Sequence, residues 1–304
     1  MNFFSRNLRV FAQFSPPEQI RLFFGLCARR FSLPIFAGES LIQAKGQFES
    51  LMLAGVTLKR VSPAHTLITY NGDPELGTYE VLARRDSSDA DIFIQVVLQK
   101  EYRPILDLFK KQWPSRKASV IVDAGGYIGI TGLYFHKLFP SARIIVLEPN
   151  SENFSLLKKN VDRSRGETVT PVRAGLWGAD ERLVAAEKFR DGRAWSFSLR
   201  PGRESEQNAV EGMTLETLRR QFDFESIDLL KMDIEGAERS VFEDERRIST
   251  VLSRVRIIAI EIHDEFKCRD QILSILRKNS FVTFQSGELT IGHNASLAEA
   301  ERIG

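Results

Sequence analysis

The chain of 304 residues is 43% hydrophobic and 27% charged, which is the composition of an ordinary globular protein with a sizeable core. Its net charge of +2 is too mild to indicate a nucleic-acid-binding protein. The two cysteines, Cys27 and Cys268, lie far apart in the sequence, so we expect free thiols in a reducing, cytoplasmic compartment rather than a disulfide scaffold.

The N-terminal region contains a candidate amphipathic helix over residues 15–31. Ser15 is a suitable helix cap, and Glu18 completes a capping box. We expect this helix to pack on the main domain, or else to contact a membrane surface or a partner, because arginines flank its apolar face. Charges and a proline interrupt the apolar stretch 20–36, so we expect no transmembrane segment, and no signal peptide is evident.

The next segment predicts two short strands and a helix. Residues 67–70 and 79–82 are typical of strands around a turn at 71–74. From Ile92, apolar residues recur at helical spacing as far as Phe109, and Pro114 ends the pattern. We assign residues 1–117 to an N-terminal extension with helical and mixed structure, a candidate acceptor- or partner-binding region. Residues 118–304 then form the main domain.

The main domain begins with a strand, a glycine turn and a helix. Residues 118–122 are β-branched and apolar, residues 123–129 contain three glycines, and residues 130–138 have helical periodicity. This pattern starts a nucleotide site in a doubly wound sheet, where the free N–H groups of the helix face the ligand. Gly125 and Gly129 allow a sharp turn and a close approach of the backbone.

Two acidic residues indicate which class of nucleotide ligand this turn binds. Asp123 stands at the end of the first strand, where its carboxylate repels a pyrophosphate but attracts the ammonium of S-adenosylmethionine. Glu148 ends the next apolar strand, 144–147, where an acid accepts hydrogen bonds from both ribose hydroxyls. We therefore expect S-adenosylmethionine as the cofactor. An NAD(P)-dependent oxidoreductase is the alternative, because it shares the turn and the ribose acid.

Strands and helices alternate from residue 118 onward, which predicts a parallel sheet with helices on both faces. A polar, glycine-containing stretch, 178–212, interrupts this alternation and is interpreted as a long insertion, with a candidate β-ribbon at 194–199. We predict an α/β fold with a doubly wound, mostly parallel sheet. Strands are expected at 118–122, 144–147, 168–172, 227–232, 256–262, 281–284 and 289–291, and helices at 130–138, from 150, at 214–218, from 236 and at 271–278.

Four blocks of the sequence resemble the FkbM-type S-adenosylmethionine-dependent methyltransferases. They are residues 120–129, 146–154, 227–238 and 260–263, and the likeness extends over about 90–285. The resemblance implies a class I, Rossmann-like methyltransferase that transfers a methyl group to a hydroxyl, often of a sugar or a secondary metabolite. The chain departs from the family where Gly126 and Tyr127 replace the usual Ala-Asn, and a bulky tyrosine there is expected to narrow the cofactor site or stack on part of it.

Candidate catalytic residues follow the fourth and fifth strands. Asp233 and Glu235 are expected to line the methyl-transfer cavity, and His263 to act as general base, because imidazole titrates near neutrality. Asp233, Glu235, Glu261 and His263 include the residue types of a Mg²⁺ or transition-metal site, but no tight ligand spacing supports one, so we expect metal-independent catalysis.

The remaining cofactor contacts are expected around the adenosine. Pro149, Asn150 and Asn153 are predicted to shape the ribose edge, Trp177 to flank the adenine and Asp180 to meet its amino group. A small-molecule or saccharide acceptor, and no nucleic acid, is therefore expected. No feature indicates an oligomeric state. A non-catalytic interaction protein that keeps the fold is a further alternative, suggested by Tyr127 and the N-terminal helix.

Overall fold

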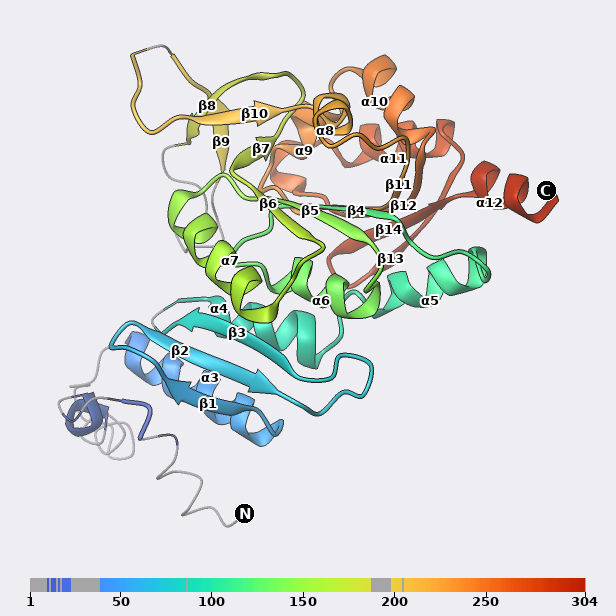
Figure 1. Ribbon diagram of the computed structural model, residues 1–304. Helices are drawn as coiled ribbons and strands as arrows, with labels where there is room; N and C mark the ends of the chain where they lie inside the picture. Colours follow the sequence, from blue (N-terminus) through green and yellow to red (C-terminus); the bar gives the residue numbers. More distant parts are fainter. Residues whose placement is uncertain are drawn as a thin grey trace. The chain divides into compact units, whose positions relative to one another are not determined.

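The computed structural model describes most of the chain: residues 10, 12–14, 16, 18–22, 39–85, 87–186, 198–203 and 205–303 (Figure 1). These residues fall into two compact units, Met1–Gln99 and Lys100–Gly304. The second unit includes helix α5 (Arg103–Gln112), which the sequence analysis placed in the N-terminal extension. The boundary after residue 117 stays a prediction.

The first unit contains an antiparallel sheet and two helical segments. Helix α3 (Glu39–Leu53) precedes strands β1 (Thr57–Arg60), β2 (His65–Tyr70) and β3 (Tyr79–Arg84), which pair in the order β1-β2-β3. Helix α4 (Asp89–Phe93) continues into a π-helical turn, Ile94–Leu98. The expected strands and helix are confirmed, but Lys100, at φ 58°, ends the helix before α5 begins.

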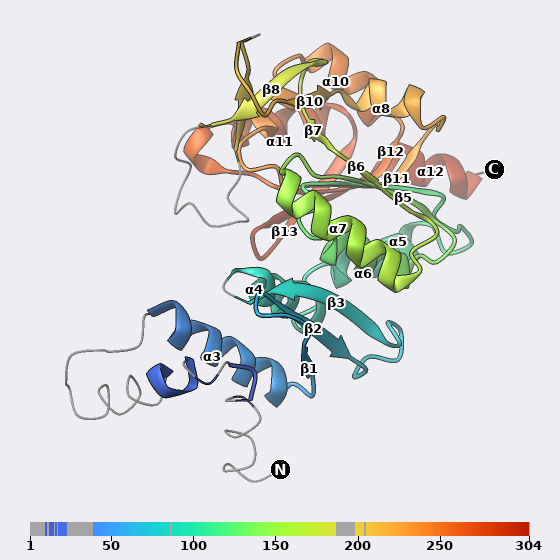
Figure 2. The ribbon, with the colours of Figure 1, turned by 60° about the vertical axis from the view of Figure 1, so that its left-hand side comes forward.

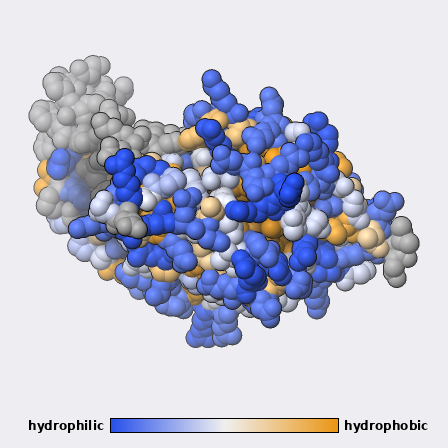
Figure 3. Space-filling model, turned by 90° about the horizontal axis from the view of Figure 1, so that it is seen from above, coloured by the Kyte–Doolittle hydropathy of each residue, from blue (hydrophilic) through white to orange (hydrophobic). Residues whose placement is uncertain are grey.

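Only part of the N-terminal helix expected over 15–31 lies within the described residues. Residues 16 and 18–22 are helical, Leu22 is buried and Ile20 is exposed. Cys27 lies outside the described residues. Among those that are described, no helix is both long and apolar enough to span a membrane. The face of the molecule drawn in Figure 3 is mostly hydrophilic, with hydrophobic residues scattered over it.

The second unit is built on a seven-stranded sheet with the order β13-β14-β12-β11-β4-β5-β6. All its strands are parallel except β14, which pairs antiparallel with β12 and β13. The bounds are β4 (Val120–Ala124), β5 (Arg143–Leu147), β6 (Val169–Val172), β11 (Ile227–Met232), β12 (Val255–Glu261), β13 (Phe281–Ser286) and β14 (Leu289–Asn294). The doubly wound, mostly parallel sheet is thus confirmed.

Helices cover both faces of this sheet (Figures 1 and 2). Helices α8 (Leu215–Gln221), α10 (Glu245–Leu252) and α11 (Arg269–Lys278) bury apolar side chains against β4, β5, β11 and β12 on one face. Helices α5, α6 (Ile130–Leu138) and α7 (Ser151–Ser164) lie on the other. The central strands β4 and β11 are fully buried, as parallel strands between two helical layers must be. The short helix α9 (Glu238–Val241) follows β11, and α12 (Ala295–Ile303) ends the described chain.

The stretch expected as a polar insertion forms a second, smaller sheet. Its strands, in the order β7-β10-β8-β9, are β7 (Ala174–Leu176), β10 (Val210–Met213), β8 (Glu181–Ala185) and β9 (Leu199–Pro201). The sequence missed most of it, because short strands that carry polar side chains resemble loops. Residues 194–197 of the expected ribbon lie outside the described residues.

A buried carboxylate holds together the end of the main sheet opposite the glycine turn. Asp228, fully buried on β11, accepts hydrogen bonds from the backbone N–H groups of Ser119 (2.7 Å) and Val120 (3.1 Å). It also pairs with Arg116 (2.9 Å) and Arg256 (3.2 Å). One side chain thereby links the start of β4 to β11 and β12.

We expect Asp228→Ala to lower the free energy of unfolding by about 3–5 kcal/mol, because it leaves two backbone N–H groups without their acceptor and removes a buried carboxylate partner of Arg256, which is buried, and of Arg116, which is half-buried. Urea denaturation followed by circular dichroism measures the change. Asp270→Ala, at an exposed site on α11, is the matched control and is expected to change stability little. Equal stability of the two variants would contradict this account of Asp228.

Candidate active site

The predicted acids gather at one edge of the main sheet. Strands β4, β5, β11 and β12 run parallel and are neighbours, so their carboxyl ends meet there. Asp123 and Glu148 stand at the ends of β4 and β5. Asp233 and His263 stand one and two residues beyond β11 and β12. Ligands of open α/β sheets bind at this edge.

The glycine turn between β4 and α6 packs directly on the neighbouring strands. Gly125 has φ +83°, and a Cβ there would lie 1.7 Å from the carbonyl oxygen of Asp233. A Cβ on Gly126 would lie 2.1 Å from Val146 Cγ1. Gly129, with φ +93°, precedes α6 directly. The glycines are therefore required by backbone packing as well as by any ligand.

Tyr127 occupies a conformation that few side chains favour. Its φ of 52° is left-handed, which costs a non-glycine residue roughly 1–2 kcal/mol and which asparagine tolerates better. Asparagine, the residue that the resembling family usually has at this position, adopts this backbone conformation at a lower cost than tyrosine does. The backbone N–H of Tyr127 donates to Glu148 Oε2 at 2.8 Å, so the turn and the acid are directly connected.

Asp123 is fully buried and faces a lysine that the sequence analysis did not single out. Lys231 Nζ lies 3.2 Å from Asp123 Oδ1 and donates to the carbonyl oxygens of Gly125 (2.8 Å) and Ala124 (3.3 Å). Burial raises the pKa of Asp123, and the charge of Lys231 partly offsets this rise. The sequence signal for Lys231 was a lysine near the end of a strand that is apolar except for Asp228. The structure pairs it in register with Asp123.

This ion pair gives Asp123 a structural role in addition to the one that the sequence predicted. The sequence argument gave its carboxylate to the ammonium of a cofactor, but the structure gives it a cation from its own chain. Contact with the cofactor stays a prediction for Asp123. Its structural task is to compensate Lys231, which fixes the glycine turn to β11.

We expect Lys231→Met to lower the free energy of unfolding by about 3–5 kcal/mol, because it leaves Asp123 as an uncompensated buried acid. The double variant Lys231→Met/Asp123→Asn removes both charges and should recover part of this loss. A double-mutant cycle from urea denaturation measures the coupling. Additive effects of the two single substitutions would contradict the pairing.

Glu148 binds the backbone around it with both carboxylate oxygens. Oε1 accepts from the backbone N–H of Asn150 at 2.8 Å and from Asn153 Nδ2 at 3.4 Å, while Oε2 accepts from Tyr127. Burial raises the pKa of Glu148 to about 7, although these N–H donors lower it. Asn150 also caps α7, as expected from the sequence, and Pro149 lies between it and Glu148.

Trp177 and Asp180 make their contacts on the smaller sheet and α8 instead. Trp177 Nε1 donates to Glu181 Oε1 at 2.8 Å. Asp180 accepts from the backbone N–H of Thr214 (2.7 Å) and from Thr217 Oγ1 (2.6 Å) at the start of α8. These contacts of the two residues thus hold the protein together, and their roles toward adenine stay predictions.

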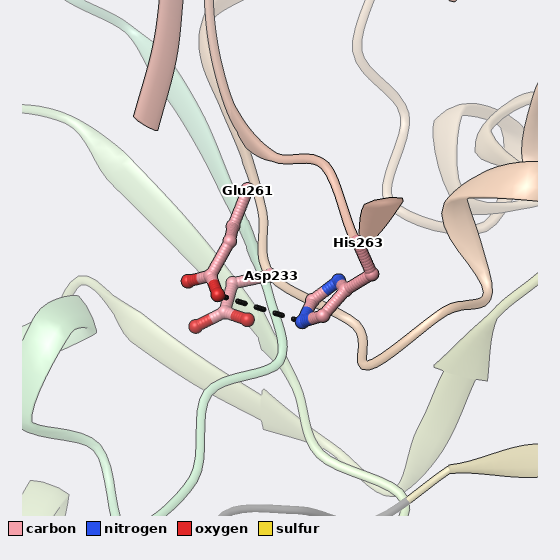
Figure 4. Close-up of side chains that lie close together, drawn as sticks. All are labelled: Asp233, Glu261 and His263. Atoms are coloured by element: carbon pink, nitrogen blue, oxygen red, sulfur yellow. Dashed lines mark ion pairs between the residues drawn. The ribbon is translucent and has the colours of Figure 1, made fainter. Parts of the chain in front are cut away.

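His263 is the centre of an acidic cluster. Its Nδ1 lies 3.0 Å from Glu238 Oε1, and its Nε2 lies 3.4 Å from Glu235 Oε2 and 3.5 Å from Glu261 Oε1. Figure 4 shows Asp233 and Glu261 directed toward the ring. Glu235 lies before α9 with φ 51°, and Glu238 is the first residue of α9.

These neighbours alter the proton affinity of the cluster. Burial opposes a charge on His263, but the hydrogen bond to Glu238 and the charges of Glu238, Asp233 and Glu235 outweigh it and raise its pKa to about 9. Burial and the charge of Asp233 raise the pKa of Glu261 to about 8. The imidazole is therefore protonated at neutral pH, which the sequence argument for a base titrating near neutrality did not anticipate.

Tyr102 belongs to the same edge and was missed as a site residue. It is buried and packs edge-to-face on Phe135 with ring centroids 5.3 Å apart. Burial, and then the charges of Glu101, Asp233 and Asp123, raise the pKa of its phenol well above 10. The sequence signal was a tyrosine just before a helix, which on its own predicts only packing.

The fold and the site together define the class of protein. A doubly wound sheet with one antiparallel strand inserted near its edge, a glycine turn after β4 and an acid at the end of β5 are the features of a class I, Rossmann-like methyltransferase. The methyltransferase FkbM domain matches residues 123–283, which is more than half of the chain. The chain belongs to this family, which favours a methyltransferase over the oxidoreductase alternative.

Two fungal relatives agree with this assignment. Methyltransferase 1 of Beauveria bassiana (strain ARSEF 2860) is 28% identical over 142 residues, which is 40% of this chain and 57% of that protein. The chain thus spans little more than half of that relative. Methyltransferase sdnD of Sordaria araneosa is 27% identical over 197 residues, 53% of this chain and 73% of that protein.

Solved structures overlap only loosely with the chain. A putative rRNA methylase from Clostridium thermocellum is 10% identical with a TM-score of 0.38, and the match covers 64% of this chain and 94% of that one. An rRNA methylase from Streptococcus thermophilus is 13% identical with a TM-score of 0.39, over 64% of this chain and 96% of that one. TM-scores this low do not establish the fold, which is assigned from the order and direction of the strands.

Proposed function

We propose that this protein is an S-adenosylmethionine-dependent O-methyltransferase that acts on a hydroxyl of a saccharide or glycan-type acceptor. The observation that supports it most is the position of the glycine turn and Glu148 beside the acidic cluster around His263, at one sheet edge. The glycine turn and Glu148 suit a nucleoside, and the cluster around His263 suits a neutral compound that carries a hydroxyl group.

The residues of the turn fit the cofactor. Oε2 of Glu148 accepts one backbone N–H and keeps a lone pair for a ribose hydroxyl. Oε1 already accepts from Asn150 and, at 3.4 Å, from Asn153, so a second ribose hydroxyl would take the place of the Asn153 amide. Gly125 and Gly129 keep the backbone free of Cβ atoms beside this acid. When bound, S-adenosylmethionine supplies an electrophilic methyl group on a sulfonium.

The acidic cluster supports the choice of acceptor. Asp233, Glu235 and Glu261 offer carboxylate oxygens, which accept hydrogen bonds from hydroxyl groups. The same charges repel phosphates, which argues against a nucleic-acid acceptor. We assign Asp233, whose side chain is 32% exposed, to orient the acceptor hydroxyl, and Glu235 and His263 to take its proton.

The pKa of Glu148 predicts how cofactor affinity depends on pH. Because the carboxylate is the form that accepts both ribose hydroxyls, affinity for S-adenosylhomocysteine should rise as the pH rises through about 7. Calorimetry between pH 6 and 8 measures it. In Glu148→Gln the binding should be weak and nearly independent of pH, whereas the exposed control Glu152→Gln should behave as the wild type. A flat wild-type profile would contradict this role.

Transfer of a labelled methyl group to a panel of sugars and glycans tests the activity. The rate should rise about tenfold per pH unit below about 9, because only neutral His263 accepts a proton. His263→Asn should slow transfer about 10²–10⁴-fold with little loss of cofactor affinity. His136→Asn removes a half-buried histidine on α6 that bonds Thr168, and serves as the control. Unchanged rates in His263→Asn would exclude the histidine as the base.

A further inference from the structure

Three side chains of the acidic cluster lie close enough together to share one ligand. Asp233 follows β11, while Glu261 ends β12 and His263 comes two residues later. One donor atom from each lies within 4.8 Å of the other two (Figure 4). Two neighbouring strands of the rigid central sheet therefore hold all three.

The histidine is oriented for a ligand by a second carboxylate. Nδ1 lies 3.0 Å from Glu238 Oε1, so in the neutral imidazole the proton belongs on Nδ1 and the Nε2 lone pair faces Asp233 and Glu261; an ion would displace the second proton, which Nε2 carries in the protonated ring. His263 is 2% exposed, and among the described residues Nε2 has no hydrogen-bond partner. Histidines that bind metals are held in this way, with the other ring nitrogen donating to a carboxylate.

The spacing also fits a shared ion. Nε2 of His263 and Oε1 of Glu261 are 3.5 Å apart. Two ligands that each lie about 2.1 Å from one ion at a tetrahedral angle are about 3.4 Å apart. Only the Asp233 carboxylate, whose side chain is partly exposed, would need to turn further inward.

We propose that Asp233, Glu261 and His263 bind one divalent transition-metal ion, with Glu238 holding the histidine. Mixed imidazole and carboxylate donors favour Mn²⁺, Co²⁺ or Zn²⁺ over Mg²⁺, which prefers oxygen ligands alone. This departs from the metal-independent site that the sequence predicted. The role of the ion rests on the proposed function: bound at this edge, it would hold the acceptor hydroxyl and lower its pKa as a Lewis acid. Because the ion would occupy Nε2 of His263, Glu235 would then take the proton in place of the histidine.

Cobalt titration of tag-free, chelator-treated protein at pH 7.5 tests the site directly. Co²⁺ should give saturable visible absorption bands at one ion per chain. Glu261→Gln and His263→Gln should each weaken binding at least about tenfold. Asp264→Asn is the matched control, because Asp264 is an exposed acid next to His263 that pairs with Arg269 instead. Circular dichroism confirms that each variant is folded.

The outcomes separate this proposal from the proposed function. Saturable binding that is lost in Glu261→Gln and kept in Asp264→Asn supports the site, whether or not methyl transfer is found. Failure to bind Co²⁺, Mn²⁺ or Zn²⁺ saturably, or equal binding in all variants, overturns it. A wild type that binds S-adenosylhomocysteine and methylates a sugar at an unchanged rate in EDTA overturns the site and leaves the methyltransferase proposal standing.

Discussion

The buried ion pair between Lys231 and Asp123 is the interaction on which the active-site edge depends. Lys231 reaches from the middle of the sheet to the glycine turn, where its ammonium also binds two backbone carbonyl oxygens. A buried lysine is costly unless it is paired, and Asp123 provides that pairing on the adjacent strand. The turn is thus anchored before any ligand binds, which is the preorganisation that a binding site requires.

The remaining polar residues divide the edge into two chemically distinct halves. Glu148 and the backbone of the turn form one half, which offers hydrogen-bond acceptors beside a surface without Cβ atoms. Asp233, Glu261 and His263 form the other, which brings two carboxyl groups and an imidazole together. Because the strands are parallel, both halves lie at the same edge, as methyl transfer between two bound molecules demands.

Much of this organisation was readable from the sequence because it depends on local signals. The periods of buried strands and helices predicted the central sheet, and the positions of Glu148 and Asp233 at the ends of its strands were predicted as well. What was missed depends on partners far away in the chain. Lys231 forms an ion pair with Asp123 on another strand, and Asp180 accepts a hydrogen bond from Thr214, the residue that caps α8. The protonation of His263 follows from Glu238, Asp233 and Glu235, a short segment after β11 that only the fold brings beside the histidine.

The central claim is that the glycine turn and Glu148 bind an S-adenosyl cofactor. The most direct test is calorimetric titration of the wild-type protein with S-adenosylhomocysteine, with NADH as the control. The account predicts saturable binding of S-adenosylhomocysteine at one molecule per chain and none of NADH. Binding of NADH, or of neither compound, would contradict it.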